Sequence, residues 1–123
     1  MLITWINKLR KKIAPAPAVD PKEFKTKGDH RQMKKVRILV KGMVQGVGFR
    51  YTTKMLADKL GIAGIVRNEN DGSVYIEANG SPERIDAFID GIKRSPSPSA
   101  SVEDVTVEED ESIEERMNFT VTN

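Results

Sequence analysis

A glycine-rich stretch at residues 42–50, with the letters GMVQGVGFR, has the residue types of an anion-binding loop. Gly46 and Gly48 allow the backbone to curl so that successive N–H groups point into one concavity. The helix expected to follow contributes the positive end of its dipole, and Arg50 in its first turn adds a forked guanidinium. A phosphate group fits those donors. Glycines between a strand and a helix are also common for steric reasons, so spacing alone leaves both interpretations open.

The composition excludes most catalytic chemistries. The 123 residues contain no Cys and a single His, so the chain has no thiolate nucleophile, disulfide framework or His-rich metal cluster. Nucleotide-binding motifs are also absent, because no Gly-Lys-Ser/Thr follows the glycines and no third glycine stands at dinucleotide-binding spacing. Glu69 and Asp71 belong to a turn, and these two acids alone do not support a metal site.

Two sequence signatures resemble those of the acylphosphatase family. They comprise residues 44–50 (VQGVGFR), then 64–68 (GIVRN) followed by 70–74 (NDGSV). Their order and the spacing from Arg50 to Asn68 agree with that family, and the resemblance extends over about residues 35–123. One departure is Ile65, where many members carry Trp. We expect this departure to alter packing beside the site more than the chemistry.

The resemblance implies a small, monomeric cytoplasmic hydrolase that cleaves the carboxyl–phosphate bond of small acyl phosphates, without metal, cofactor or covalent intermediate. It implies that Arg50 binds the phosphate and that Asn68 positions the attacking water. Backbone amides would complete the cradle, and they belong to Gln45, Gly46, Val47, Gly48, Phe49 and Arg50. Taken without the resemblance, Arg50 would be a surface helix residue in an ion pair, and Asn68 would end a strand before a turn. Arg67 and Lys41 are expected near the pocket, where a solvated role is favoured over steering.

This chemistry accounts for the missing Cys and catalytic His. An acyl phosphate expels a carboxylate, whose conjugate acid has a pKa of about 4, so no general acid is needed. The demanding steps are to stabilise charge on the phosphoryl oxygens and to hold a water in line. The side-chain amide of Asn68 can orient a water but cannot accept its proton. That proton therefore goes to a phosphate oxygen of the substrate or to solvent.

Hydrophobic periodicity predicts the elements that hold these residues. A β-branched run at residues 36–40, ending before Gly42, predicts a buried strand, and residues 49–60 predict a helix that stops at Gly61. Apolar runs at 62–68 and 73–79 flank an Asp-Gly pair, which predicts an antiparallel hairpin with a two-residue turn.

A second helix is predicted from Ser81, as the N-cap, and Pro82, with apolar residues at 85, 88, 89 and 92. Two final strands follow, the first with valines at 102, 105 and 107 and the second with Met117, Phe119 and Val121. Residues 108–115 between them are predicted to form a solvated turn. The order predicts an α+β, ferredoxin-like βαββαβ sandwich, mostly antiparallel, with both helices on one sheet face and an extra C-terminal strand.

Charge divides the chain into a basic leader, residues 1–34, and an acidic domain, residues 35–123, with net charges of +6 and −4. Residues 1–13 have the spacing of a short basic amphipathic helix, and the Pro-containing remainder predicts a flexible linker. The leader is either a solvated tail, which we favour, or a weak membrane-surface anchor. Export is not expected. Translation could also start at Met33, which would omit the leader.

Two other classes of function compete with the enzyme. Ferredoxin-like domains include RNA-binding modules, but here the domain is acidic and its strands carry few aromatics, Tyr75 and Phe119 among them. A degenerate domain could bind anions without turnover, although Arg50 and Asn68 are both present. Related domains also occur inside larger carbamoyl-transfer proteins, and a stand-alone protein is expected because the chain ends right after the domain.

Overall fold

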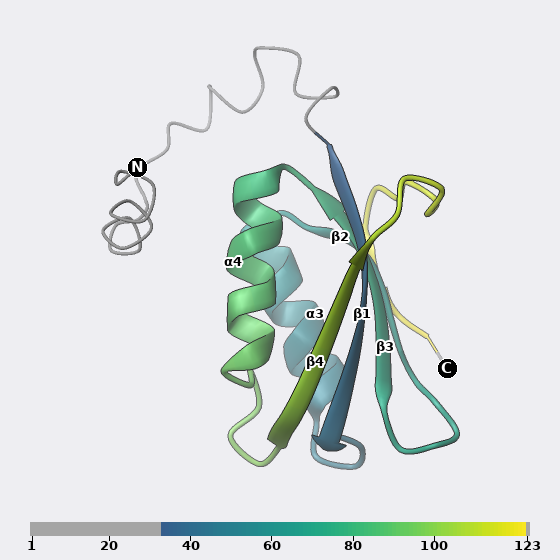
Figure 1. Cartoon of the computed structure of the whole chain (residues 1–123). Helices are drawn as coiled ribbons and strands as arrows, with labels where there is room; N and C mark the ends of the chain where they lie inside the picture. Colours follow the sequence, from purple (N-terminus) through teal and green to yellow (C-terminus); the bar gives the residue numbers. More distant parts are fainter. Residues whose placement is uncertain (1–32, 123) are drawn as a thin grey trace, which may run out of the picture. The chain divides into compact units, whose positions relative to one another are not determined.

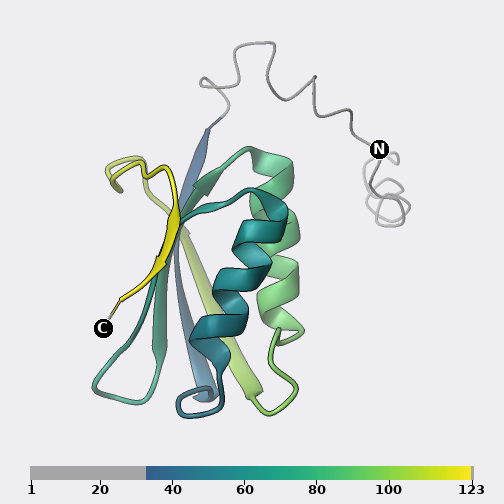
Figure 2. The ribbon, with the colours of Figure 1, turned by 180° about the vertical axis from the view of Figure 1, so that it is seen from behind.

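The computed structural model describes residues 33–122, so the predictions for residues 1–13 and for most of the linker lie outside the described residues. In Figures 1 and 2 the described strands form one twisted sheet and both described helices cover the same face of it. Within this part of the chain, neither helix is long and apolar enough to cross a membrane.

The sheet has five strands in the order β4-β1-β3-β2-β5. The elements are β1 (Lys34–Met43), α3 (Phe49–Leu60), β2 (Ala63–Asn68), β3 (Val74–Gly80), α4 (Pro82–Lys93), β4 (Ser101–Glu109) and β5 (Phe119–Val121). Neighbouring strands pair antiparallel except β2 and β5, which are parallel. The predicted ferredoxin-like α+β fold with an extra C-terminal strand is confirmed.

Local capping explains why α3 ends and α4 begins where the sequence predicts. Gly61, with φ 71°, ends α3 and donates its amide to the carbonyls of the last turn. At the start of α4, the Ser81 hydroxyl accepts a hydrogen bond from the Arg84 amide at 3.4 Å, and Pro82 occupies the first turn. These signals lie within a few residues of each helix end, so they can be read from the sequence.

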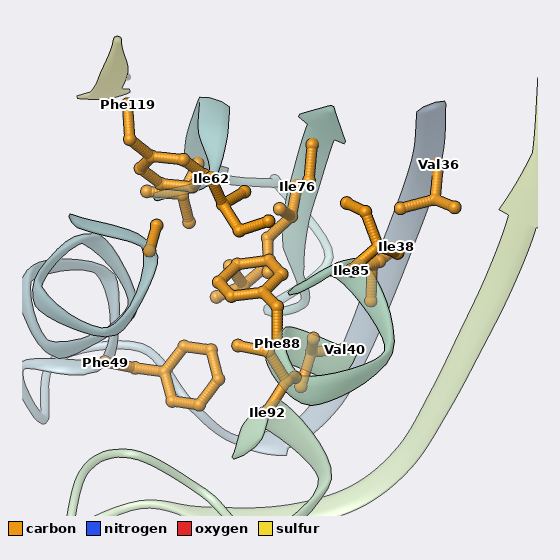
Figure 3. Packing of buried hydrophobic residues seen from close by; sticks show 14 of the residues in the cluster. Val36, Ile38, Val40, Phe49, Ile62, Ile76, Ile85, Phe88, Ile92 and Phe119 are labelled. Carbon is orange, nitrogen blue, oxygen red and sulfur yellow. The ribbon is translucent and has the colours of Figure 1, made fainter. Parts of the chain in front are cut away.

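The core lies between the helices and one face of the sheet (Figure 3). Alternate residues of β1, namely Val36, Ile38 and Val40, are completely buried, as the two-residue period of a strand requires. Phe88 of α4 contacts Phe119 of β5 edge to face, with ring centroids 5.9 Å apart. Burial of these aromatic rings ties the last strand to the second helix.

β1 is longer than the predicted strand at residues 36–40. It spans Lys34–Met43 because it pairs with β3 along one side and with β4 along the other. A register shift between Lys41 and Gly42 lets the pairing with β4 continue past the glycine. The apolar run marks only the buried centre of this strand.

The predictions for the chain between β4 and β5 were partly wrong. Residues 108–115 are not a solvated turn throughout, because β4 continues to Glu109 and Ile113 is buried with 5% of its surface exposed. Met117 was assigned to the last strand, but it precedes β5 and is 90% exposed. Only three residues of this segment pair with β2, so the apolar spacing overestimated the strand.

Candidate functional site

Three loops lie at the same end of the domain in both views of the ribbon (Figures 1 and 2). They are the β1–α3 loop at residues 44–48, the β2–β3 loop at residues 69–73 and the α4–β4 loop at residues 94–100. The predicted phosphate-binding stretch forms the first of these loops. Asn68 immediately precedes the second.

Side-chain hydrogen bonds connect the β1–α3 loop to the other two loops. The Gln45 Nε2 donates to the backbone carbonyls of Glu69 and Ser73, at 2.8 and 2.9 Å. The Ser97 hydroxyl donates to the Val47 carbonyl at 2.8 Å. The anion-binding stretch is therefore held from two sides by groups far away in sequence.

The two glycines of the β1–α3 loop adopt the left-handed conformation that the sequence suggests. Gly46 has φ 76° and Gly48 has φ 79°, a region that costs a residue with a side chain roughly 1–2 kcal/mol. A Cβ atom at either position would meet nothing within 4 Å, so space does not select glycine here. The backbone conformation itself selects glycine at these positions.

The β1–α3 loop presents backbone donors. Among the described residues, no backbone carbonyl accepts a hydrogen bond from the amides of residues 45–48. Gly48 is the N-cap residue of α3, and no described side chain accepts a hydrogen bond from the amides at this helix end. The first turn has no acidic residue, and the first helical hydrogen bond runs from the Thr52 amide to the Gly48 carbonyl at 3.0 Å. Uncapped amides and the positive end of the helix dipole together favour an anion at this position.

Arg50 lies beside the C-terminal ends of β2 and β5. Its Nη1 donates to the Thr122 carbonyl at 3.2 Å, and the Thr122 amide in turn donates to the Val66 carbonyl at 2.8 Å. Val66 stands two residues before Asn68 on the same strand, so this chain of bonds brings the guanidinium to the strand end that carries Asn68. The structure thus brings Arg50 and Asn68 to the same part of the sheet from positions 18 residues apart in sequence.

Asn68 ends β2 with an unused acceptor. The residue shares a sheet face with Val66, which is completely buried under the helices. Its Oδ1 is buried and has no hydrogen-bond partner among the described residues. A buried acceptor without a partner costs about 1–3 kcal/mol, and ordered water or a bound group satisfies most such atoms in native proteins.

The β2–β3 loop differs from the predicted two-residue turn. The Gly72 amide donates to the Glu69 carbonyl at 3.2 Å, and only Gly72 in this loop has a positive φ. Asn70 and Asp71 therefore join Gly72 in a three-residue loop, the second common hairpin type. The Asp71 carboxylate accepts from the Ser73 hydroxyl and amide, which lowers its pKa, so the loop keeps these bonds at neutral pH.

Arg67 and Lys41, the two residues expected near the pocket, have solvent-accessible side chains. Arg67 lies on the open face of the sheet, opposite to Asn68, with its Nε 2.7 Å from Glu69 and its guanidinium carbon 4.4 Å from the centre of the Tyr75 ring. The Glu69 carboxylate raises the pKa of Arg67, so this arginine stays charged and paired. Lys41 is exposed near the end of β1, and together with the hydrogen bonds from Ser73 its charge lowers the pKa of Asp71 in the β2–β3 loop.

The described part of the chain contains no group of three or more His, Cys, Asp or Glu side chains that could hold a metal ion. A hollow of about 400 Å³ lies between α3 and residues 117–119, and it contains none of the predicted site residues.

Sequence reasoning missed three contributions to the site. No sequence pattern marks Ser97, Thr122 lies beyond the last predicted strand position, and only the backbone amide of Gln45 is predicted to bind the anion. Each contributes a hydrogen bond to residues 24 to 72 positions away in the chain. A buried serine in a Pro-rich loop has no distinguishing pattern in one sequence.

The connection through Gln45 leads to a first prediction. Gln45→Met keeps the length of the side chain but leaves two carbonyls unpaired, so we expect stability to fall by about 1–2 kcal/mol. Because the loops that carry the amides and Asn68 would separate, kcat/KM for an acyl phosphate should fall by about tenfold. Denaturant unfolding and steady-state kinetics measure the two effects. Gln45→Glu places a carboxylate against both carbonyls, so it should lower stability and kcat/KM more than Gln45→Met does. A Gln45→Glu variant with stability and kcat/KM equal to or above those of Gln45→Met would contradict this role.

A family model for acylphosphatase matches residues 36–121. The acylphosphatase of Enterococcus faecalis is 53% identical over 89 residues, which cover 72% of this chain and 98% of that protein. The residues matched by the family model therefore include both sequence signatures, all of β1 except its first two residues, and every later strand and helix of the described chain.

Solved structures agree with the family model. The acylphosphatase of Bacillus subtilis superimposes with a TM-score of 0.70 at 41% identity, covering 73% of this chain and 99% of that one. Full-length HypF, in its phosphate- and nucleotide-bound form, matches with a TM-score of 0.66 at 33% identity over 75% of this chain but only 12% of its own length. With a family model over most of its residues and relatives matched along nearly their full length, the chain belongs to the acylphosphatase family and is a hydrolase of the acylphosphatase type.

Proposed function

We propose that this protein hydrolyses the carboxyl–phosphate bond of small acyl phosphates, without a metal ion, using Arg50, Asn68 and the backbone amides of residues 45–50. The observation that carries the proposal is the buried, unpartnered Oδ1 of Asn68, on the strand whose end Arg50 reaches through Thr122. A group that donates a hydrogen there would lie beside a cluster of phosphate donors. A water molecule is the simplest such group.

In this proposal the phosphoryl group of the substrate binds in the β1–α3 loop. Its oxygens accept hydrogen bonds from the loop amides, and the N-terminus of α3 adds a favourable dipole. Arg50 binds phosphoryl oxygens, and its contact with the Thr122 carbonyl holds the guanidinium in one orientation. These donors stabilise the negative charge that spreads over the phosphoryl oxygens during transfer.

Asn68 holds the attacking water. Its Oδ1 accepts a hydrogen from the water, which leaves an oxygen lone pair to attack phosphorus. A bond forms between the water oxygen and phosphorus as the bond from phosphorus to the carboxylate oxygen breaks. The products are a carboxylate and inorganic phosphate. Since the amide of Asn68 cannot take up a proton, the one proton that the attacking water loses passes to a phosphoryl oxygen or to solvent, and the other stays on the transferred oxygen.

The RNA-binding alternative has little support from the sheet. Phe119 is 3% exposed and faces the core, so it cannot stack on a base. Tyr75 lies on the open face, but Arg67 covers its ring, and its hydroxyl bonds with Arg37 at 2.9 Å and with Glu77 at 2.7 Å. Base stacking needs aromatic faces that are accessible.

The proposal extends to the organisation of the protein. Residues 35–123 form the catalytic domain, and residues 1–34 form a basic leader that takes no part in the chemistry. The enzyme acts as a monomer in the cytoplasm. No nucleic acid is required for its activity.

The purified full-length chain tests the proposal with acetyl phosphate and benzoyl phosphate as substrates. We expect release of inorganic phosphate that is unchanged by EDTA, together with competitive inhibition by phosphate. Phosphate binding without turnover would favour the non-catalytic anion-binding domain. Absence of both in a folded protein would reject the assigned site, and loss of activity in EDTA would reject metal independence.

A further inference from the structure

Ser97 is a buried serine in contact with the phosphate-binding loop. Only 3% of its surface is exposed, and its hydroxyl donates to the Val47 carbonyl at 2.8 Å across a separation of 50 residues. Val47 lies between the two glycines with positive φ. The contact therefore acts on the most conformationally free part of the loop.

The geometry of a peptide unit gives this contact a consequence for Gly48. No described peptide bond is cis, so the Val47 carbonyl and the Gly48 amide of the same planar unit point in opposite directions. When Ser97 holds the carbonyl on its own side, the Gly48 N–H is directed away from Ser97. Rotation of this peptide by half a turn would exchange the two groups and present a carbonyl where the donor had been.

Little else in the loop opposes that rotation. A change of the peptide between residues 47 and 48 alters φ of Gly48, and glycine populates positive and negative φ about equally. The same rotation changes ψ of Val47, and a residue with a side chain has allowed regions at both extended and helical ψ. Among the side chains that the structure describes, the Ser97 hydroxyl stabilises one of the two orientations, because it donates to the Val47 carbonyl.

Ser97 is itself held in place. The Ser95 hydroxyl donates to the Ser97 carbonyl at 2.8 Å, and the Ala100 amide donates to the same oxygen at 3.1 Å. Ser95 has φ 71°, which makes it the one described non-glycine residue in the left-handed region. Pro96 and Pro98 limit the backbone on both sides of Ser97. The α4–β4 loop is therefore a rigid support for the hydroxyl.

We propose that Ser97 is a positioning residue that locks the Val47–Gly48 peptide with the Gly48 amide directed toward the bound phosphoryl group. This inference rests on the proposed function for its effect on catalysis. Ser97 does not touch the substrate, and it acts through the orientation of one backbone donor. Ser97 is the residue of the α4–β4 loop that carries this role.

Ser97→Ala removes the hydroxyl, and Ser99→Ala, in the same loop at an exposed position, is the matched control. We expect Ser97→Ala to weaken inhibition by inorganic phosphate by about tenfold and to lower kcat/KM by about 10- to 100-fold, somewhat less than loss of an oxyanion donor. In ¹⁵N–¹H spectra, the Gly48 amide of wild type should shift on addition of phosphate, and this shift should be reduced in Ser97→Ala. Ser97→Thr, which keeps the hydroxyl, should recover phosphate affinity, and Ser99→Ala should behave as wild type.

Ile85→Val, a core change in α4, separates positioning from loss of stability, because it should lower Tm without changing the phosphate inhibition constant. Unchanged phosphate affinity and an unchanged Gly48 response in folded Ser97→Ala would overturn the inference. The inference would also be overturned if Ile85→Val lowered the affinity for phosphate as much as Ser97→Ala does, at the same decrease in Tm. If the wild-type protein neither binds phosphate nor turns over substrate, the proposed function is wrong. If the wild type is active and Ser97→Ala has unchanged activity and phosphate affinity, only the positioning role of Ser97 is rejected.

Discussion

Replacement of Arg50 by alanine should lower kcat/KM for acetyl phosphate by about 10³-fold, which is roughly 4 kcal/mol of transition-state stabilisation. The guanidinium supplies the side-chain cation among donors that are otherwise backbone amides, so its loss affects both binding and the charged transition state. KM and the phosphate inhibition constant should rise, and kcat should fall as well. Steady-state kinetics with phosphate as a competitive inhibitor separates the two effects.

Two further variants make the Arg50 prediction sharper. Arg50→Lys should recover only part of the activity, because an ammonium is a point charge that cannot form the forked contact. Arg94→Ala, at the end of α4, removes an exposed arginine whose partner is Asp90 at 3.1 Å, and it should leave kcat/KM unchanged. Arg50→Ala with more than a tenth of wild-type kcat/KM would contradict the role of Arg50 in the cradle.

Asn68→Leu should lower kcat by about 10²- to 10³-fold with little change in the phosphate inhibition constant, because it removes the group that orients the water. The same change should not destabilise the fold. It deletes a buried acceptor that has no partner among the described residues, so the free energy of unfolding should stay the same or rise by about 1 kcal/mol. Kinetics and denaturant unfolding of one purified variant measure both outcomes.

Asn79 provides the matched control for Asn68. Asn79 is a buried asparagine on β3, next to β2, whereas Asn68 is half-buried. The Nδ2 of Asn79 donates to the Arg116 carbonyl at 3.1 Å, and its Oδ1 accepts from the Arg116 amide at 2.9 Å. Asn79→Leu should therefore cost about 2–3 kcal/mol of stability and leave kcat unchanged. If Asn68→Leu lost stability and retained kcat, the residue would be structural and the assignment of the water would be wrong.

The helices show how much of this fold is local information. The end of α3 and the start of α4 agree with the sequence because Gly61, Ser81 and Pro82 act within one turn of those helix ends. The burial of Ile85, Phe88 and Ile92 also follows from helical spacing. Caps and periodicity depend on neighbours in the chain, and a single sequence contains those neighbours.

The errors concern features that depend on distant partners. The extra length of β1 comes from pairing with β3 and β4, and the burial of Ile113 comes from the way the chain returns to the sheet. The hairpin turn was wrong by one residue because an Asp-Gly pair is compatible with more than one loop length. Neighbouring letters do not distinguish these outcomes.

The sequence by itself determined the chemical groups of the proposed site: an arginine, an asparagine and a run of amides made accessible by Gly46 and Gly48. It also determined that no cysteine takes part in the chemistry. Only the tertiary structure decided that the end of β5 holds Arg50 and that Ser97 faces the carbonyl of Val47. The physical reason is that these hydrogen bonds join residues 72 and 50 positions apart, and their geometry exists only after the sheet has assembled.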